Sequence, residues 1–376
     1  MMQRCLVACA ALALATVAGA QTTIFSEDWD DGLGADRWSD PLIQLETETL
    51  SFDGSVDYNF DYSVIASSAP NSAGGSTTGI YMETNTTDDG DVDEGESVGV
   101  IPNGFTLPAG DFTFSADLYL FWNGGSGSTE YSIFGVHHQG SDQVSNRFAG
   151  NNGDGLSYQV DTDGDSGTDL LRFENDGVIN SNSGLAPPFG PGWEDIPNGT
   201  IPGVPTGATS PIGIANQWVD MEITATGDTI EFKINGVVLD TYANNADGGF
   251  FSGGTILIGQ SDPFNSTNLD NPQGLSNAAI WDNIVVTTPG GGGDPNPGDF
   301  NADGTVDNGD LNLLLNNWGE LAAAVDPLWV NNLNGTVDND ELNALLNNWG
   351  FGISAVPEPT TALLLLAGLA MRSRRR

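Results

Sequence analysis

The sequence predicts a mainly β protein, a two-sheet antiparallel jelly-roll sandwich followed by a small α-helical unit of the EF-hand type. Residues 21–288 contain short segments in which apolar and polar positions alternate, which is the period of a half-buried strand. Clusters of Gly, Asn, Asp and Ser, typical of turns, separate these segments. Residues 299–350 instead contain one loop written twice, each copy followed by leucines at helical spacing.

The N-terminal segment, residues 1–20, has the parts of a secretory signal peptide. A basic residue precedes an apolar run from Cys5 to Val17, and Ala18 and Ala20 occupy the small-residue positions of a cleavage site. We therefore expect export of the chain. Cys5 and Cys9 are its two cysteines, so the mature fold must be stable without disulfides.

The chain is strongly acidic, with 9 Lys and Arg against 51 Asp and Glu and a formal net charge of −42. Such a surface repels nucleic acid and anionic membranes, so we exclude nucleic acid as a partner. The same charge suits calcium, a saline medium, or solubility alone, and it does not choose among them. Between the terminal segments the basic residues are Arg37, Arg147, Arg172 and Lys233.

The clearest strand pattern lies between Trp218 and Tyr242, where apolar residues alternate with polar ones. Two-residue turns at Gly227–Asp228 and Asn235–Gly236 divide it, and Asn-Gly favours the primed turn of a hairpin. Three strands of an antiparallel meander follow from this pattern. Further strands are expected over 112–122, 131–138, 256–258 and 280–286.

Residues 289–298 are rich in Gly and Pro and read as a flexible linker between the sandwich and the helical unit. The loop that follows has the spacing of a calcium loop, with Gly304 at the position of the sharp turn. Oxygen ligands at alternate positions would surround a hard divalent cation, so Ca²⁺ is the expected cofactor. The expected ligands are Asp299, Asn301, Asp303, Thr305, Asp307 and Asp310.

The second copy of the loop has fewer charged ligands, since Val330 stands at its first position. Ligand charge sets calcium affinity, so occupancy of this loop stays open. Its expected ligands are Asn332, Asn334, Thr336, Asp338 and Glu341.

Each loop is followed by a predicted short helix with one apolar stripe, and the two stripes are expected to pack against each other. Gly319 and Gly350 stand where a glycine commonly ends a helix. The expected stripes are Leu311, Leu314, Leu315 and Trp318 in the first helix, and Leu342, Leu345, Leu346 and Trp349 in the second.

This duplicated loop and helix resembles a type I dockerin, and the resemblance implies a calcium-binding fold that docks onto a cohesin-like or other surface protein. The departures concern the partner face. Dockerins that bind cohesin often have Ser-Thr where this chain has Asn308-Gly309 and Asn339-Asp340. The resemblance therefore implies that the metal fold is retained while the usual partner contacts are not.

The sandwich region also resembles a family, the concanavalin A-like lectin and glucanase sandwiches, including laminin-G-like modules. The resemblance lies in FSEDWDDG to RWSD (25–40), WVDMEITATGDTIEFKING (218–236) and AIWDNIVV (279–286). It concerns a fold pattern and not a catalytic signature. It implies an extracellular polysaccharide as the partner.

The C-terminal segment, residues 356–376, contains Pro357, Glu358 and Pro359, then an apolar run, then a basic end. As a helix the run reaches roughly 15–18 Å against a hydrocarbon core of about 30 Å, too short for a permanent span. The order of parts resembles the PEP-CTERM sorting signal. The resemblance implies transient membrane contact, processing by an exosortase-type enzyme near this motif, and a location at the cell surface or in the extracellular matrix of a Gram-negative-type bacterium.

The sequence shows no E-x-D-x-x-E strand motif that would provide the paired carboxylates of a sandwich glucanase. His137 and His138 are adjacent, so on a strand they point to opposite faces and cannot share a metal. Asp161, Asp163 and Asp165 alternate in an acidic loop that is either a calcium site or a solvated turn.

Four tryptophans have a bearing on sugar binding. Trp122 and Trp193 stand beside Gly-rich loops and could stack on sugar rings or belong to the core, whereas Trp218 and Trp281 lie in strand patterns and are interpreted as structural. Taken together, the sequence predicts a secreted, surface-sorted modular protein with a non-catalytic sandwich that binds glycan or is structural. The alternatives are a polysaccharide-degrading hydrolase or lyase, and a purely structural matrix protein.

Overall fold

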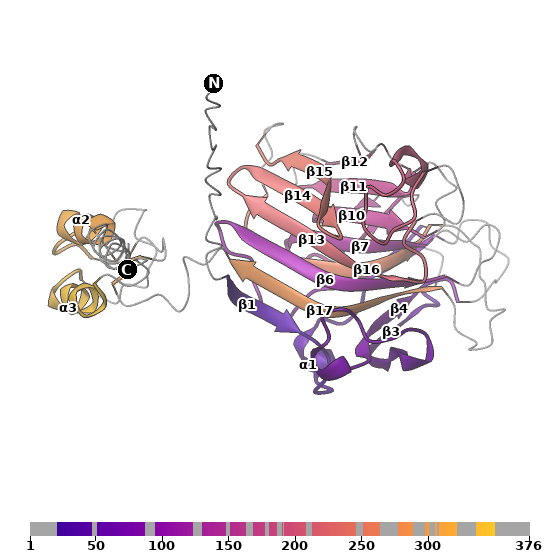
Figure 1. Cartoon of the computed structure of the whole chain (residues 1–376), viewed down its shortest axis with the longest axis horizontal. Helices are drawn as coiled ribbons and strands as arrows, with labels where there is room; N and C mark the ends of the chain where they lie inside the picture. The colour runs from indigo at the N-terminus through magenta and orange to yellow at the C-terminus, as the bar shows by residue number, and fades with distance from the viewer. Residues whose placement is uncertain are drawn as a thin grey trace, which may run out of the picture. The chain divides into compact units, whose positions relative to one another are not determined.

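A computed structural model describes part of the chain (Figure 1). The predicted signal peptide, the sorting signal with Pro357, Glu358 and Pro359, and most of the linker lie outside the described residues. The chain divides into two compact units, one spanning Thr23–Thr288 and one holding the C-terminal helices. The described ranges are 21–46, 51–86, 95–122, 130–147, 151–162, 168–176, 180–185, 190, 192–207, 213–245, 251–263, 277–288, 298–300, 305–306, 308–321 and 336–349.

The first unit consists of two antiparallel sheets packed face to face, which confirms the predicted β-sandwich (Figure 1). The eight-stranded sheet has the order β15-β14-β13-β6-β17-β4-β3, and β1 also pairs with β17. Its strands are β1 (Thr22–Glu27), β3 (Ser55–Asp61), β4 (Thr78–Glu83), β6 (Phe112–Phe121), β13 (Trp218–Thr226), β14 (Thr229–Ile234), β15 (Val237–Ala243) and β17 (Ala278–Thr288).

The seven-stranded sheet has the order β12-β11-β10-β7-β16-β5-β2. Its strands are β2 (Leu42–Leu45), β5 (Glu96–Val100), β7 (Tyr131–His138), β10 (Gly155–Asp161), β11 (Leu170–Asn175), β12 (Asn180–Gly184) and β16 (Thr255–Asp262). The small elements are β8 (Ser145–Asn146), β9 (Asn151–Asn152), α1 (Gly34–Arg37), η1 (Tyr62–Val64), η2 (Ala73–Gly75) and η3 (Trp193–Asp195).

The predicted meander is confirmed as β13, β14 and β15. Asn235 and Gly236 both have positive φ, 47° and 76°, which is the conformation that a primed hairpin turn needs. The strands expected over 112–122, 131–138, 256–258 and 280–286 are confirmed as β6, β7, β16 and β17.

Aromatic rings from both sheets fill the core between them. Phe114 of β6 stacks on Phe134 of β7 at 4.1 Å, and Phe134 in turn stacks on Trp281 of β17 at 5.5 Å. Tyr158 of β10 stacks on Phe232 of β14 at 4.3 Å. These stacked rings bury large apolar areas and hold the two sheets together without any disulfide.

Two segments cover the outer faces of the sheets. Residues 62–77, between β3 and β4, lie over the eight-stranded sheet through Tyr62 and Ser72. Residues 139–147 and 151–154, which include β8 and β9, lie over the seven-stranded sheet, and we call them the strap. As a result, the strands β5, β7 and β10 are buried on both faces.

The second unit contains α2 (Asn308–Asn316) and α3 (Asn339–Asn348) around a small apolar core. The predicted stripes are wrong in part. Leu313 and Leu314 are buried in α2, whereas Leu315 is 60% exposed and Trp318 is 46% exposed. In α3 only Leu345 is fully buried, with Leu346 at 59% and Trp349 at 46%.

Leu311 and Leu342 pack against this core as predicted, and loop residues complete it at the positions where the prediction is wrong. Phe300, Val306 and Val337 pack against it and turn the face of α2 that carries Asp310 inward. Gly319 has φ of 86° just after α2, as expected for a terminating glycine, and Gly350 lies outside the described residues. Among the helices in the described ranges, none has the length and apolar character of a membrane span.

Candidate functional site

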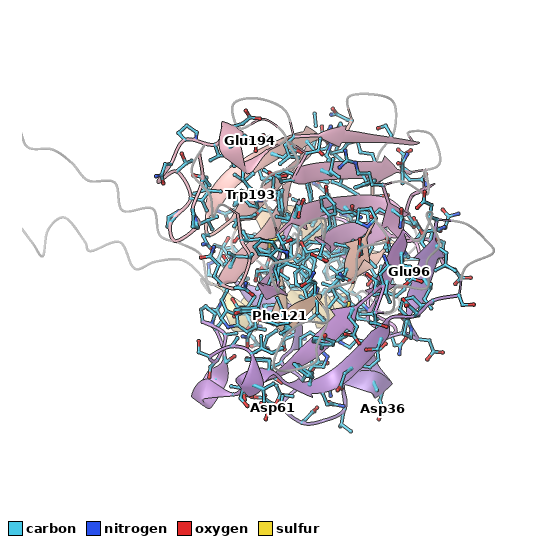
Figure 2. The ribbon with its side chains drawn as sticks, turned by 90° about the vertical axis from the view of Figure 1, so that its right-hand side faces the viewer. Asp36, Asp61, Glu96, Phe121, Trp193 and Glu194 are labelled. Carbon is cyan, nitrogen blue, oxygen red and sulfur yellow. The ribbon has the colours of Figure 1, made fainter. Side chains whose placement is uncertain are left out.

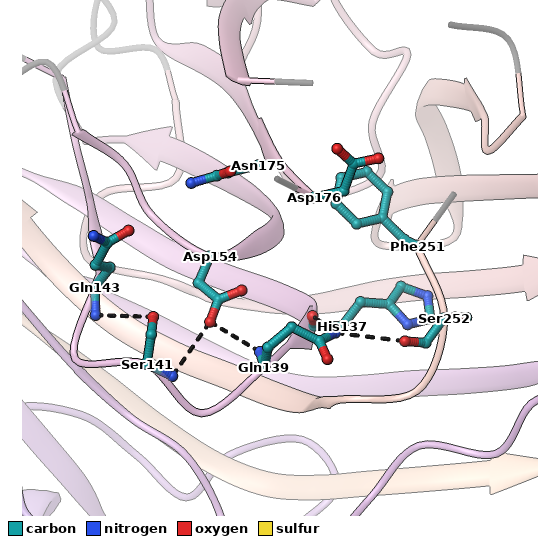
Figure 3. A pocket seen from close by; sticks show the side chains of 9 residues that line it. All are labelled: His137, Gln139, Ser141, Gln143, Asp154, Asn175, Asp176, Phe251 and Ser252. Carbon is teal, nitrogen blue, oxygen red and sulfur yellow. Dashed lines mark hydrogen bonds between the residues drawn. The ribbon is translucent and has the colours of Figure 1, made fainter. Parts of the chain in front are cut away.

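A polar pocket of about 510 Å³ lies at one end of the seven-stranded sheet (Figure 3). Neighbouring strands run antiparallel, so the ends of β7 and β11 meet the beginnings of β10 and β16 at this edge. The described residues that line it are His137, Gln139, Ser141, Gln143, Asp154, Asn175, Asp176, Phe251 and Ser252.

Asp154 closes the pocket on the strap side. Its Oδ2 accepts the backbone N–H of Gln139 at 3.0 Å and of Ser141 at 3.3 Å, which ties the end of the strap to its beginning. Both bonds use the same oxygen, and the second oxygen makes no hydrogen bond to the residues drawn (Figure 3). That oxygen is placed to accept a hydrogen bond from a ligand.

His137 forms the floor beside the Phe251 ring. It has φ of 61°, next to an irregularity in the pairing of β7 with β16. Its Nδ1 lies 2.9 Å from the carbonyl oxygen of Gly253, so Nδ1 holds the proton and Nε2 is an acceptor. Burial lowers the pKa of His137, which keeps the ring neutral at neutral pH.

The two histidines do not act together, as the alternation predicted. The Nε2 of His138 lies 3.0 Å from the carbonyl oxygen of Gln143, whereas His137 binds Gly253. His138 therefore holds the strap, and only His137 faces the pocket.

Side-chain amides and one aromatic ring complete the wall. The Nε2 of Gln139 donates to the carbonyl oxygen of His137 at 2.7 Å, and the Nδ2 of Asn175 donates to that of Gly153 at 2.6 Å. These bonds fix the planes of both amides. Phe251 is 3% exposed, so it is chiefly a wall and offers only its edge to a ligand.

A row of aspartates crosses the outer face of the eight-stranded sheet. Asp117 of β6 pairs in register with Asp220 of β13 on one side and with Asp282 of β17 on the other. Burial raises the pKa of Asp220 to about 6 and that of Asp282 to about 6, and it also raises the pKa of Asp117. Sequence reasoning missed this row because it searched along one strand, and the row runs across three.

The row does not form an accessible acid–base pair, because the segment 62–77 seals two of its members. Asp117 is 0% exposed and accepts the Nδ2 of Asn71 at 2.8 Å. Asp282 is 1% exposed and accepts the hydroxyl of Tyr62 at 2.6 Å and that of Ser72 at 2.9 Å. These carboxyl groups fasten the covering segment to the sheet.

Glu96 of β5, labelled in Figure 2, is a further buried carboxyl group and is 2% exposed. It accepts the N–H groups of Asp53 at 3.3 Å and Asn85 at 3.2 Å. Burial raises the pKa of Glu96 to about 8, and the Asp53 charge adds to the rise. A carboxyl with a raised pKa keeps a proton that the unfolded chain has released, so stability falls as the pH rises through that window.

We therefore expect the thermal midpoint of the sandwich to fall as the pH rises from about 5 to about 8. The stability that depends on protonated Asp220 and Asp282 is lost as the pH rises through about 6, and the stability that depends on protonated Glu96 is lost as it rises through about 8. Glu96→Gln removes this titrating group, so its loss of stability between about pH 5 and pH 8 should be smaller than that of the parent by on the order of 3 kcal/mol. Calorimetry of both proteins over this range measures the effect, and parallel pH profiles would contradict the assignment.

The structure describes part of the first predicted calcium loop. Asp299 is 3% exposed, Asp310 is 0% exposed, and Thr305 is half-buried. The Oδ1 of Asp310 accepts the N–H of Phe300 at 2.7 Å, which closes the loop between its beginning and its end. These oxygen donors suit a hard cation. Asn301, Asp303 and Asp307 lie outside the described residues, so the calcium site stays a prediction.

The second loop is described at Thr336, Asp338 and Glu341, and Asn332 and Asn334 lie outside the described ranges. The Glu341 carboxylate accepts the N–H of Asp338 at 2.8 Å and so caps the beginning of α3. Across the described ranges, no three or more Asp, Glu, His or Cys side chains are grouped so as to hold a metal.

The third acidic loop is described only at its first position. Asp161 is 0% exposed, and its Oδ1 lies 3.2 Å from the Thr162 hydroxyl. Asp163 and Asp165 lie outside the described residues.

Three of the four tryptophans considered for sugar binding, namely Trp193, Trp218 and Trp281, have structural roles. Trp193 (Figure 2) is fully buried and donates to the carbonyl oxygen of Asp161 at 3.1 Å, so it belongs to the core and does not stack on sugar. Trp281 is also buried, and Trp218 packs against Tyr62 and Tyr119, which confirms the structural interpretation.

No family model matches the chain, and a search of curated proteins found no match. The chain is similar in fold to a cellulose-induced protein, Cip1 (14% identity over 70% of this chain and 96% of that one, TM-score 0.36). It is also similar to the carbohydrate-binding module CBM66 from Bacillus subtilis (12%, 60% and 93%, 0.28) and to a glycoside hydrolase family 16 endo-glucanase from Bacteroides ovatus (8%, 70% and 99%, 0.38). At these identities and scores the likeness concerns the fold, and no functional argument rests on it.

Proposed function

We propose that the protein is an exported, surface-sorted module whose sandwich binds a neutral extracellular polysaccharide without cleaving it. The single observation behind this proposal is the chemistry of the pocket. It combines two carboxylates, three side-chain amides and a neutral imidazole, which come from strand ends and the adjoining loops of one sheet.

Sugar hydroxyl groups both donate and accept hydrogen bonds, so they need a wall that offers both roles. Carboxylates such as Asp154 and Asp176 accept, and amides such as Gln139, Gln143 and Asn175 present both a donor and an acceptor. The volume of about 510 Å³ is that of a small-molecule site, which suits a short stretch of sugar units.

The charge of the pocket selects among glycans. Its described lining contains two carboxylates and neither lysine nor arginine. Uronate or sulfate groups would be repelled, and the net charge of −42 adds to this repulsion. A neutral polysaccharide is therefore the favoured ligand.

Binding is favoured over hydrolysis for a specific reason. A glycoside hydrolase needs a carboxylic acid that stays protonated near neutral pH beside a carboxylate. The carboxyl groups with raised pKa values, namely Asp117, Asp220, Asp282 and Glu96, lie outside the described lining of this pocket.

For the helical unit we propose calcium binding in the first loop and docking onto a cohesin-like or other surface protein. The support for docking is that Leu315 of α2 and Leu346 of α3 are exposed at equivalent positions of the two repeats, as are Trp318 and Trp349 just after these helices. The exosortase-type enzyme remains the proposed partner of the sorting signal.

Replacing Gln143 with alanine should weaken binding of the mature protein to laminarin or agarose by about three- to tenfold, because one amide contact worth ~1 kcal/mol is lost. The matched control is Asn59→Ala, which removes an exposed amide from β3 on the other sheet. Affinity electrophoresis in each polysaccharide measures the change, with anionic alginate as a comparison. Stronger retardation by alginate, or equal retardation of Gln143→Ala and the parent, would count against the proposed pocket.

A further inference from the structure

Four large apolar side chains of the helical unit are exposed, and they form two equivalent pairs. Leu315 of α2 and Leu346 of α3 occupy the same position of the two repeats, and both are exposed. Trp318 and Trp349 repeat this just after the two helices. We call these four residues the paired face. Single exposed apolar residues are common on protein surfaces, whereas larger sets of them mark places of interaction.

The two repeats share this face although they differ elsewhere. Their predicted calcium loops, DFNADGTVDNGD and VNNLNGTVDNDE, differ at six of twelve positions. The segments that follow, LNLLLNNWG at 311–319 and LNALLNNWG at 342–350, differ only where buried Leu313 corresponds to Ala344. Packing restricts buried positions, whereas exposed positions tolerate most changes. Identity at the exposed positions, with a difference at a buried one, therefore points to a contact outside the unit.

The ends of α2 and α3 are built in the same way, so that they present both pairs alike. The Nδ2 of Asn317 donates to the carbonyl oxygen of Leu313 at 2.8 Å. In the second repeat the Nδ2 of Asn348 donates to the carbonyl oxygen of Ala344, also at 2.8 Å. Each bond satisfies one of the carbonyl groups left open at the end of a helix. It also holds the turn that carries the tryptophan.

The paired face lies in an uncharged part of an acidic unit. Residues 311–319 and 342–350 contain no Asp, Glu, Lys or Arg, whereas the rest of 299–350 contains nine acidic residues and no basic one. Covering the face therefore buries no charge without a partner. The centres of protein interfaces have the same character, since they are depleted in charge and enriched in tryptophan.

A second copy of the same unit is the partner that fits this face best. A surface that occurs twice in one unit is matched by a partner that also presents it twice, and the unit itself meets this requirement. Leucine and tryptophan then meet leucine and tryptophan, so apolar surface is buried on both sides. The four half-exposed side chains offer roughly 400 Å² per copy. A standard interface buries about 800 Å² per partner, so we expect a dissociation constant on the order of 10 µM or weaker.

We propose that the helical unit docks onto the helical unit of a second copy of this chain, and that the paired face forms the centre of the contact. This inference rests on the docking function proposed above and names its partner.

The first test uses the unaltered sequence and its dependence on salt. Both copies are acidic, so salt screens their mutual repulsion and strengthens the association. Docking onto a basic partner would instead weaken with salt. Sedimentation velocity of the mature protein in calcium, ending before Pro357 so that the apolar tail is absent, measures the dissociation constant. It should fall at least about threefold between about 0.05 and 0.5 M NaCl. A monomer at about 100 µM protein in the higher salt would overturn the proposal.

The second test removes the tryptophans. Trp318→Ser with Trp349→Ser should raise the dissociation constant at least about tenfold, because tryptophan carries much of the binding energy at interfaces. The matched control is Leu321→Ser, since Leu321 is exposed in the same unit but corresponds to Gly352 in the second repeat. Circular dichroism in calcium checks that both variants keep the helices. An equal loss in the control, or no loss in the double variant, would show that the association does not use the paired face.

Immobilised cohesin separates this inference from the function on which it rests. A parent protein that stays monomeric but is retained by cohesin would overturn self-association and leave the docking function in place. A parent that neither associates with itself nor is retained by cohesin would remove the proposed docking function as well.

Discussion

Replacing Arg172 with methionine should lower the free energy of unfolding of the sandwich by about 3–5 kcal/mol, because it leaves buried carboxylates without their counter-charge. Arg172 of β11 binds Glu174 at 2.6 Å on its own strand and Asp240 of β15 at 2.8 Å on the opposite sheet. The side chains of both acids are 5% exposed. Denaturant unfolding, followed by the fluorescence of the buried tryptophans, measures the loss.

The Arg172 network joins the two sheets at their outer strands, and Tyr158 extends it by donating its hydroxyl to Asp240 at 3.1 Å. The triple variant Arg172→Met, Glu174→Gln, Asp240→Asn is the matched control. It removes the two buried carboxylate charges together with the guanidinium group that neutralises them. It should recover most of the lost stability. A cost below about 1 kcal/mol for Arg172→Met alone is the size found for exposed pairs, and it would show that this pair is not buried in solution.

Removing calcium from the mature protein should unfold the C-terminal helical unit and leave the sandwich intact. Four carboxylates within the twelve-residue first loop repel one another unless a cation lies between them. A free calcium concentration of about 100 times the dissociation constant adds ~2.7 kcal/mol to the free energy of unfolding of this unit. Circular dichroism at the helical band reports mainly on α2 and α3, because α1 is a single turn of four residues.

Asp310→Ala should abolish the calcium response, because its carboxylate also closes the loop onto Phe300. Glu320→Ala is the matched control, since Glu320 is an exposed acid beyond the end of α2. Identical helicity and melting of the parent in calcium and in chelator would refute the calcium assignment. Retention of a cohesin-like partner in the presence of chelator would separate docking from metal binding.

The sequence predicted those parts of the fold in which local patterns and final burial agree. The meander was readable because β13 and β14 keep one face in the core and one face polar, and because Asn235-Gly236 permits only a few turn types. By contrast, β5 and β10 are buried on both faces, since the strap covers their outer sides. No periodicity in the chain could reveal that covering, because it depends on contacts between distant segments.

The helical stripes were predicted correctly at Leu311 and Leu314 and at Leu342 and Leu345, which belong to the small core, and wrongly at the remaining positions. Spacing alone favoured Leu315 and Trp318, whereas Phe300 and Val306 from the loop decide that Leu313 turns inward. The pocket was not predicted as a unit, because its residues come from the ends of four strands and form no motif. The only pocket residue that the sequence analysis had distinguished was His137, because strand alternation placed it on the opposite face from His138.

The irregularity in β17 explains how this strand accommodates Asn283. On either side of it, Asp282 pairs with Asp117 and Val285 with Ser115, so β17 has one residue more than β6 over this stretch. Asn283, at φ of 51°, is that additional residue, and it donates to Asp117 at 2.8 Å. Its deletion would leave Trp281 and Ile284 on the inner side and remove the side-chain bonds of Asn283 to Asp117 and Ser72. A homologue that lacks this one residue would therefore keep the fold. In the regularly paired part of β17, by contrast, deleting one residue would turn the apolar side chains of the strand away from the core.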